Sequence, residues 1–234
     1  MDSNWLEDLA RAATDMAHQP DPEHTLQRIR DHACRFTAAD DAGILRTRAG
    51  GALTLALANS DAVRSVEELQ LAGKAGPGID LIKSSISLRV DDTRTDPRWP
   101  RWGAAAAELG WHSVLSVRLS SRTRALGSVT LYSGRYQAFD DDAVRIAEVF
   151  AQYASIALAS SVEQEGLHRA IDARHLIGQA QGVLMERYDI DANRAFTVLQ
   201  RYSQDHNIKL REVAQHILDH RHLPDAEQPT HAMF

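Results

Sequence analysis

The stretch Ala143-Val-Arg-Ile-Ala-Glu-Val-Phe-Ala-Gln-Tyr-Ala-Ser-Ile-Ala-Leu-Ala159 is the most informative part of the sequence. Only four of its 17 residues are polar, and they recur at intervals of three and four, so they form one narrow stripe on a helix. The remaining surface is apolar, which is more than a single core-facing side requires. We therefore expect this helix to bury two sides. One can lie on its own sheet, and the other most simply packs on the same helix of a second subunit; the alternative is a helix sandwiched inside a single larger domain.

The same helix is expected to be unusually long. Three aspartates at residues 140–142 favour an N-terminus there, and neither proline nor glycine follows until Gly166. If the helix continues through this glycine to Tyr188, it spans roughly 70 Å at about 1.5 Å per residue. Because glycine inside a helix costs about 1 kcal/mol relative to alanine, Gly166 is a candidate hinge. An ordinary surface glycine would leave the same pattern.

The residues before the long helix predict four further helices. Apolar residues at helical spacing indicate one helix over residues 4–16. A second should begin at Asp21-Pro22, where a capping aspartate precedes a proline in the first turn. Ser60 favours the start of a third, and an alanine-rich stretch predicts a fourth that ends near Leu109.

Short apolar segments in the same region predict an antiparallel sheet. Two of them flank Ala49-Gly50-Gly51 and indicate a β-hairpin, and the others are bounded by turn residues. Residues 73–78 are rich in glycine but lack the spacing of a phosphate-binding loop, so they predict a simple connection. The fold class is therefore α+β, with an antiparallel sheet of about five strands and flanking helices. The expected strands cover residues 42–47, 52–58, 86–90, 114–119 and 127–132.

The last part of the chain predicts a small three-helix bundle. The end of the long helix forms the first member, Asp191 caps the second, and the third runs from about Lys209 to His220. Such a short bundle would hardly be stable alone, so anchorage on the long helix is expected. From residue 223 onward, two prolines and the lack of periodicity predict a disordered tail. The residues expected to face inward are Ile171, Ile177, Ala180, Leu184, Tyr188, Ala195, Phe196, Leu199, Tyr202, Leu210, Val213, Ala214 and Ile217.

Composition and charge exclude several classes of protein. The apolar fraction of 44% and the charged fraction of 25% are ordinary for a globular protein. No window is apolar enough for a membrane span, and the N-terminus lacks the features of a secretion signal, so a cytoplasmic location is expected. The net charge of −6 argues against non-specific coating of nucleic acid. Residues 166–222 are less anionic than the rest, with eight Lys and Arg against seven Asp and Glu.

The sequence predicts no catalytic, cofactor or metal site. Cys34 is the only cysteine, so a disulfide, a cysteine metal site and a redox pair are all excluded within the chain. Asp91-Asp92 is expected at a strand end, and the aspartates at 140–142 are expected to cap a helix. No serine or cysteine nucleophile stands at an informative spacing from a histidine, so we do not expect an enzyme.

Two sets of motifs resemble known families. The run Arg174-His-Leu-Ile-Gly-Gln-Ala-Gln-Gly-Val-Leu-Met-Glu-Arg-Tyr188 resembles the opening of an ANTAR domain, and the likeness continues through Ala195-Phe196 to residues 209–214. Gly76-Pro77-Gly78, Asp96-Pro97-Arg98-Trp99 and residues 126–132 resemble the GAF domain that often precedes ANTAR in actinobacterial regulators. The resemblance implies a GAF-like sensor domain with the dimerisation helix at residues 1–160, an ANTAR domain at 161–222 and the disordered tail at 223–234.

The resemblance also implies a function. ANTAR domains are dimeric RNA binders that recognise paired hairpin loops in nascent transcripts and so prevent termination. The chain would then be a homodimeric transcription antiterminator, acting on the RNA polymerase complex indirectly and controlled by its GAF sensor. A nearly neutral domain with a few placed cations suits this target, because RNA sequence is read mainly in exposed loops.

Exposed polar residues of the ANTAR-like part are the candidate RNA contacts. Tyr188 and Tyr202 can stack on bases, but both lie on the apolar stripe, where packing in the core is favoured. Gln181 departs from the family, which commonly has lysine there. The candidate phosphate contacts are Arg174, Arg187, Arg201, Lys209 and Arg211, and the candidate contacts to base edges are Gln179, Gln181, Ser203 and Gln204.

Three tryptophans of the GAF-like part, Trp99, Trp102 and Trp111, are candidates to line a pocket for a small ligand, although filling the core is an equal alternative. A GAF-type methionine sulfoxide reductase needs paired cysteines and is excluded. Two non-enzymatic alternatives stay open. The helical tail of a dimeric signalling protein can dock on a protein partner instead of RNA, or its last two helices can bind DNA as a helix-turn-helix.

Overall fold

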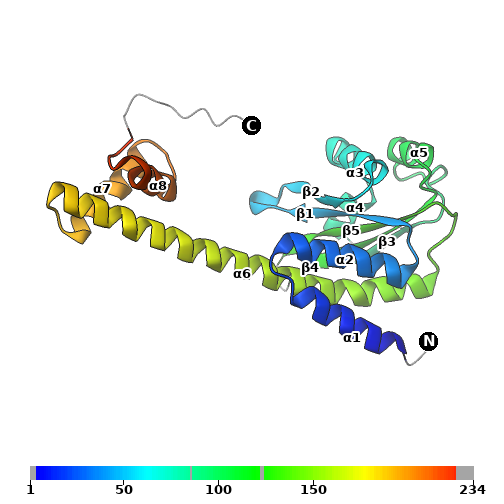
Figure 1. The fold of residues 1–234 in the computed structure, drawn as a ribbon. Coiled ribbons are helices and arrows are strands. Elements are labelled where there is room, and N and C mark those ends of the chain that lie inside the picture. Colours follow the sequence, from blue (N-terminus) through cyan, green and yellow to red (C-terminus); the bar gives the residue numbers. More distant parts are fainter. Residues whose placement is uncertain (1–3, 85, 122–123, 225–234) are drawn as a thin grey trace. The chain divides into compact units, whose positions relative to one another are not determined.

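The computed structural model describes residues 4–84, 86–121 and 124–224, and these form two compact units that divide between residues 164 and 165 (Figure 1). The helix α6 (Asp141–Tyr188) has 48 residues and contributes to both units. It runs through Gly166 without interruption, as the sequence predicts. The predicted disordered tail lies outside the described residues from position 225 onward.

The first unit is built on one antiparallel five-stranded sheet, which confirms the predicted α+β class. The strand order is β2-β1-β5-β4-β3, so the short strand β3 lies at one edge. The predicted hairpin is β1 and β2, joined by the short 3-10 helix η1 (Ala49–Gly51), in which Gly50 and Gly51 both have φ of 84°. The strands are β1 (Asp41–Thr47), β2 (Leu53–Ala58), β3 (Ser87–Val90), β4 (Ser113–Ser120) and β5 (Ala125–Ser133).

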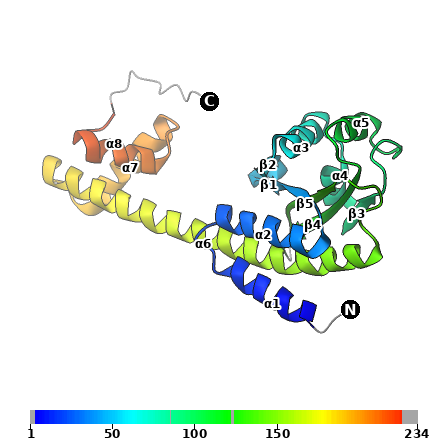
Figure 2. The ribbon, with the colours of Figure 1, turned by 45° about the vertical axis from the view of Figure 1, so that its right-hand side comes forward.

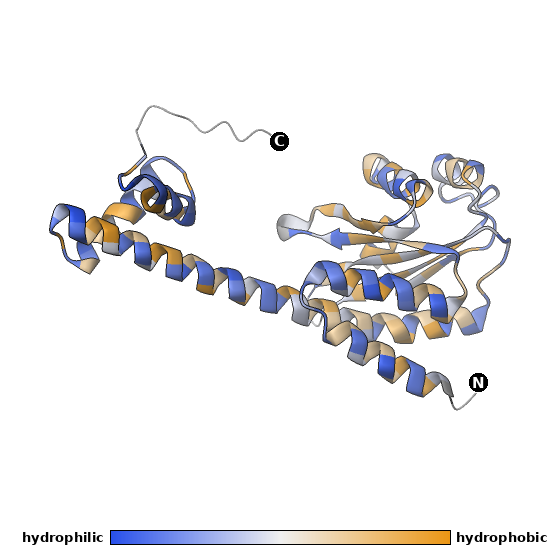
Figure 3. Cartoon of the chain, viewed as in Figure 1, coloured by the Kyte–Doolittle hydropathy of each residue, from blue (hydrophilic) through white to orange (hydrophobic). Residues whose placement is uncertain are grey.

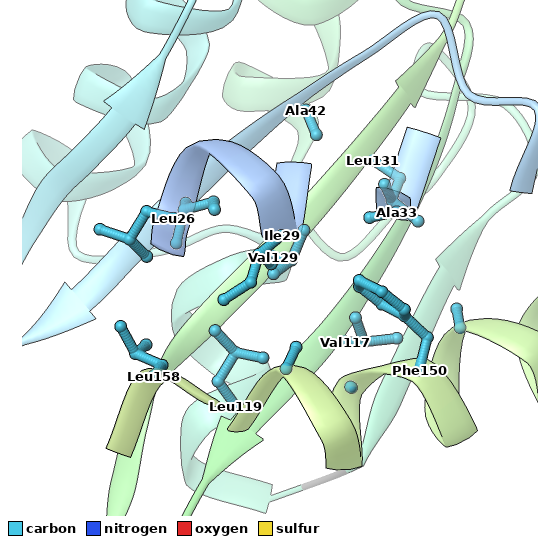
Figure 4. Packing of buried hydrophobic residues seen from close by; sticks show 14 of the residues in the cluster. Leu26, Ile29, Ala33, Ala42, Val117, Leu119, Val129, Leu131, Phe150 and Leu158 are labelled. Atoms are coloured by element: carbon cyan, nitrogen blue, oxygen red, sulfur yellow. The ribbon is translucent and has the colours of Figure 1, made fainter. Parts of the chain in front are cut away.

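One face of the sheet carries the larger hydrophobic core. It is covered by α2 (Pro22–Thr37) and the first half of α6, and α1 (Asn4–Ala17) packs on α2 farther from the sheet (Figure 2). Alternate residues of the central strands point to this face, among them Val117 and Val129, and they meet Ile29 of α2 and Phe150 of α6 (Figure 4). Each side chain of this size stabilises the fold by roughly 1.5–3 kcal/mol when it is fully buried.

The opposite face is covered by three shorter helices, α3 (Asp61–Gly73), α4 (Pro77–Ser84) and α5 (Pro100–Glu108). Helix α4 was not predicted. It begins at Pro77, since a proline is well tolerated in the first turn of a helix. The glycine-rich connection is therefore shorter than expected. Helix α3 begins after Ser60, as the sequence predicts, and the Ser60 hydroxyl accepts the N–H of Val63 as its cap. Helix α5 ends next to Leu109, where its end was predicted.

The second unit is the predicted three-helix bundle of the end of α6, α7 (Ala192–Asp205) and α8 (Leu210–His220). The Asp191 carboxylate caps α7 by accepting the N–H of Arg194 at 2.7 Å. The bundle buries Ala180, Leu184, Ala195, Leu199, Val213, Ala214 and Ile217, as predicted.

Three of the residues expected inside this bundle are exposed instead. The exposed fractions are 64% for Ile171, 50% for Tyr188 and 39% for Phe196. The bundle core includes α6 residues from Leu176 to Leu184, so Ile171 lies before this region and Tyr188 lies after it. Figure 3 shows hydrophobic and hydrophilic residues alternating along α6, which is why periodicity alone extended the buried stripe too far.

Candidate functional site

The outward side of α7 carries a mostly polar surface, in which Val198 is a partly buried apolar member. Arg194, Thr197 and Arg201 stand three and four residues apart, opposite the buried Ala195 and Leu199. Arg194, Thr197 and Arg201 line a shallow depression of about 490 Å³. The Arg201 side chain is 82% exposed and lies 3.6 Å from the Asp205 carboxylate, a contact of little strength at such exposure. Its guanidinium is therefore available to a phosphate group.

Arg194 and Thr197 were not predicted as RNA contacts. Both lie on the same side of α7 as the predicted Arg201, and the spacing i, i+3, i+7 was the signal that could have found them. The predicted Lys209 and Arg211 are exposed at the start of α8, and Lys209 Nζ lies 3.9 Å from Glu212. These four cations and one threonine make up the surface we call the basic face.

Three of the predicted RNA contacts donate hydrogen bonds within the bundle. The Arg187 guanidinium donates to the carbonyl of Arg221 at 2.7 Å, and the Gln181 amide donates to the carbonyl of Ala192 at 3.1 Å. The Ser203 hydroxyl donates to the carbonyl of Ile208 at 2.6 Å and braces the turn between α7 and α8. Each of these side chains already has a partner in the protein. The remaining candidates on α6, Arg174 and Gln179, and Gln204 on α7 are exposed.

The two tyrosines of this unit have different environments. The Tyr202 hydroxyl donates to the carbonyl of Pro224 at 2.8 Å, and its ring stacks on His206 with a centroid distance of 4.0 Å. Tyr188 is half exposed at the end of α6, and the Arg187 guanidinium lies 5.8 Å from its ring centroid. Tyr188 is therefore the tyrosine that can accept a stacked base, whereas Tyr202 is structural.

In the first unit, two of the three predicted tryptophans lie together. Trp99 and Trp102 are edge to face with a centroid distance of 6.3 Å, and both line a pocket of about 400 Å³ between α3 and α5. The Trp99 indole donates to the Asp80 carboxylate at 2.7 Å, and the Trp102 indole donates to the carbonyl of Val66 at 3.2 Å. Trp111 does not line this pocket.

Trp111 packs on Tyr132 at a centroid distance of 5.6 Å, beside a buried polar cluster that the sequence did not predict. The Tyr132 hydroxyl donates to the Glu67 carboxyl at 2.9 Å, and the Gln70 amide donates to the same carboxyl at 3.1 Å. The backbone N–H of Gly78 in α4 donates to the Gln70 side chain at 2.9 Å. The cluster thus links α3, α4 and β5 through side chains that are fully buried.

The carboxyl group at the centre of this cluster is strongly perturbed. Burial raises the pKa of Glu67 to about 7, against the opposing effect of the hydrogen bonds from Tyr132 and Thr130. Burial next to Glu67 also raises the pKa of Tyr132. The fit is tight, since a Cβ atom at Gly43 would lie 2.5 Å from the Glu67 carboxyl oxygen. The space between α3 and the sheet is therefore filled by the protein's own side chains.

Cys34 is partly buried on the larger core, and burial raises the pKa of its thiol to about 11, which makes it unreactive. Within the described residues, no group of three or more histidine, cysteine or acidic side chains is arranged to hold a metal ion. None of the described helices combines the length and hydropathy needed to cross a membrane.

Comparisons with known proteins agree with this architecture. A family model of the GAF domain matches residues 19–159, and a model of the ANTAR domain matches residues 165–218. Among solved structures, the GAF domain of an Acinetobacter phosphoenolpyruvate-protein phosphotransferase has 15% identity and a TM-score of 0.53, over 68% of this chain and 95% of that one. The bacteriophytochrome RpBphP3 from R. palustris has 12% identity and a TM-score of 0.56, over 79% of this chain and 43% of its own length.

A third solved structure, free methionine-R-sulfoxide reductase from Neisseria meningitidis, has 14% identity and a TM-score of 0.51, over 67% of this chain and 89% of that one. At these identities the likeness shows the fold alone. None of the curated proteins matches the chain. The GAF model covers more than half of the chain, and the ANTAR model follows it directly. Both are regulatory rather than catalytic domains, and the chain belongs to the GAF family as a two-domain regulator with a GAF sensor domain followed by an ANTAR output domain.

Proposed function

We propose that the protein is a transcription antiterminator whose ANTAR domain binds hairpin loops in nascent RNA under the control of its GAF domain. The observation that carries this proposal is the ANTAR match over residues 165–218, because ANTAR domains are RNA-binding domains. All five residues of the basic face lie within the same match. Its cations are exposed, and those with acidic neighbours are only weakly paired.

The arrangement of residues fits a loop of RNA better than a duplex. Arg194 and Arg201 stand about two helical turns apart on α7 and can contact successive phosphates. Tyr188 offers a half-exposed ring on which an unpaired base can stack. Because acidic and basic residues nearly balance over residues 166–222, binding must depend on these placed contacts rather than on overall charge.

A homodimer is part of the proposal, because two hairpins need two ANTAR domains. In the first unit, α6 buries one side on the sheet and leaves Tyr153 43% and Ile156 68% exposed. Together with the partly buried Val149, these residues follow the i, i+4, i+7 spacing of a helix seam. A second copy of α6 covers such a seam most simply, and RNA polymerase is then affected indirectly through the RNA.

The test is selection from a pool of randomised tandem hairpins with the full chain, followed by titration of the enriched RNA at several salt concentrations. The double variant Arg194→Ala/Arg201→Ala should weaken binding at least tenfold, at about 1 kcal/mol or more per lost contact, and lower the salt slope by about two. Arg169→Ala is the matched control, since Arg169 has the same i, i+4 ion pair with Glu165 but lies outside the basic face. Duplex DNA and loop-scrambled RNA should bind more weakly than the selected hairpins.

Failure to enrich any hairpin would reject RNA recognition. It would favour instead a dimeric signalling protein whose helical tail docks on a protein partner. Enrichment with equal loss in the double variant and in the Arg169→Ala control would keep RNA binding but place it away from α7.

A further inference from the structure

The pocket between α3 and α5 has the size and the shape of a ligand site. Its volume of about 400 Å³ lies within the range of roughly 300–1,000 Å³ that is usual for small-molecule sites. Trp99 and Trp102 form one side, and the short side chains of Ala72 and Ala75 form the other. Both indole N–H groups are bonded inside the protein, so the rings are fixed, and the small part of each ring that lines the pocket (Trp99 is 7% and Trp102 4% exposed) is apolar.

Two arginines line the pocket, and they differ in whether an acidic side chain balances their charge. Arg98 stacks on the Trp99 ring at 4.6 Å, and its guanidinium is held by Asp96 at 2.9 Å and by the carbonyl of Arg89 at 2.7 Å. Arg101, in the first turn of α5, is exposed and forms no ion pair with any residue that the structure describes. The residues that line the pocket include no acid. One cation is therefore available to a ligand.

We propose that this pocket binds a planar aromatic monocarboxylate, with its ring against Trp99 and Trp102 and its carboxylate at Arg101. The proposal rests on the sensor role of the GAF domain proposed above. A flat apolar ring buries the most surface against two fixed indoles and short opposing side chains. A guanidinium without a partner selects an anion, and a carboxylate matches its fork geometry.

The same features argue against other ligand classes. A neutral aromatic compound would form no ion pair with Arg101, which has no ion-pair partner among the described residues. A dianion would find only one available guanidinium, because Asp96 already balances the charge of Arg98. An aliphatic acid would satisfy Arg101 but would lose the aromatic contacts with the tryptophans, which are worth about 0.5–1.5 kcal/mol beyond burial.

The test is calorimetric titration of the full chain with 2-naphthoate, 2-naphthamide and hexanoate. We expect 2-naphthoate to bind at least about tenfold more tightly than either of the others, a difference of about 1.4 kcal/mol. Arg101→Gln should remove the preference for the acid over the amide. Ala72→Phe should abolish binding by filling the pocket, and its side chain is tolerated because Ala72 is exposed on α3. Arg11→Gln, at an exposed cation of α1, is the matched control and should bind like the parent chain.

Equal affinity for 2-naphthoate and 2-naphthamide, or binding that survives Ala72→Phe, would overturn the proposal. So would the absence of 2-naphthoate binding at millimolar concentrations in a chain that is folded by circular dichroism. These titrations contain no RNA, so their failure is distinguishable from failure of the RNA selection.

Discussion

Glu67→Gln should raise the free energy of unfolding of the GAF domain at about pH 8 by about 3 kcal/mol. Glu67 is fully buried, and burial raises its pKa from 4.5 to about 7. Above about pH 7 the folded protein must hold a negative charge in a place without solvent, and glutamine removes this cost. A rise in pKa from 4.5 to about 7 corresponds to about 3 kcal/mol, at about 1.36 kcal/mol per unit.

The sign of the pH dependence follows from proton binding. Between about pH 4.5 and 7 the folded state holds a proton on Glu67 that the unfolded chain has released. Raising the pH over this range therefore favours the unfolded chain, so stability should fall and then level off above about pH 7. Below about pH 4.5 both states are protonated, and this group contributes no further slope.

Urea denaturation of the parent chain and the variant at several pH values measures this effect. Glu67→Gln should flatten the fall in stability between about pH 4.5 and 7, and the two proteins should converge at the acid end. Glu68→Gln is the matched control, because it removes the same charge from the exposed neighbouring position of α3. A parent chain and a Glu67→Gln variant with parallel pH profiles would contradict the assignment of a raised pKa to Glu67.

The elements of the fold were predictable because their signals are local. The two-sided apolar character of residues 143–159 predicted a long helix with more than one apolar face, and Asp191 predicted the start of α7. Helix α4 was missed because its eight residues are too few to establish a period and because it begins with Pro77 and Gly78.

The candidate sites depend on contacts that no local pattern reports. Glu67 and Tyr132 are separated by 65 residues, and only the packing of α3 on the sheet turns two ordinary residues into a buried acid and its donor. Gln181 and Ser203 looked like surface polar groups because their partners are backbone carbonyls, which every sequence contains. Trp111 likewise packs on Tyr132 and does not line the pocket that Trp99 and Trp102 share, which no local pattern shows.

The exposed seam of α6 connects the fold to the proposed function. Ile156 is the most exposed large apolar residue among the described residues of the first unit, and Tyr153 precedes it by three residues. Soluble monomers tolerate single exposed apolar residues, but a row of them on a helix whose opposite side is already buried marks an interface. If two copies pair there, each dimer buries two copies of Ile156 close to the symmetry axis.

Ile156→Glu should therefore convert the dimer into a monomer at micromolar concentrations. Loss of two buried isoleucine side chains and burial of two like charges should weaken the dimer by about 4 kcal/mol or more, which is roughly a thousandfold in the dissociation constant. Sedimentation velocity measures the change, and circular dichroism should show an unchanged fold because the side chain is exposed in the subunit. Leu109→Glu is the matched control, at a 43% exposed leucine that follows α5 on the other side of the sheet.

The same variant tests why a dimer is needed. A monomer retains the basic face of one ANTAR domain, so Ile156→Glu should bind a single selected hairpin as the parent chain does. Its affinity for the tandem hairpins should fall at least about a hundredfold, because the second contact no longer benefits from the effective concentration that the dimer provides. A parent chain that sediments as a monomer, or a variant that remains dimeric, would show that another surface covers α6. Equal loss of affinity for single and tandem hairpins would instead show that the substitution damages the RNA-binding domain itself.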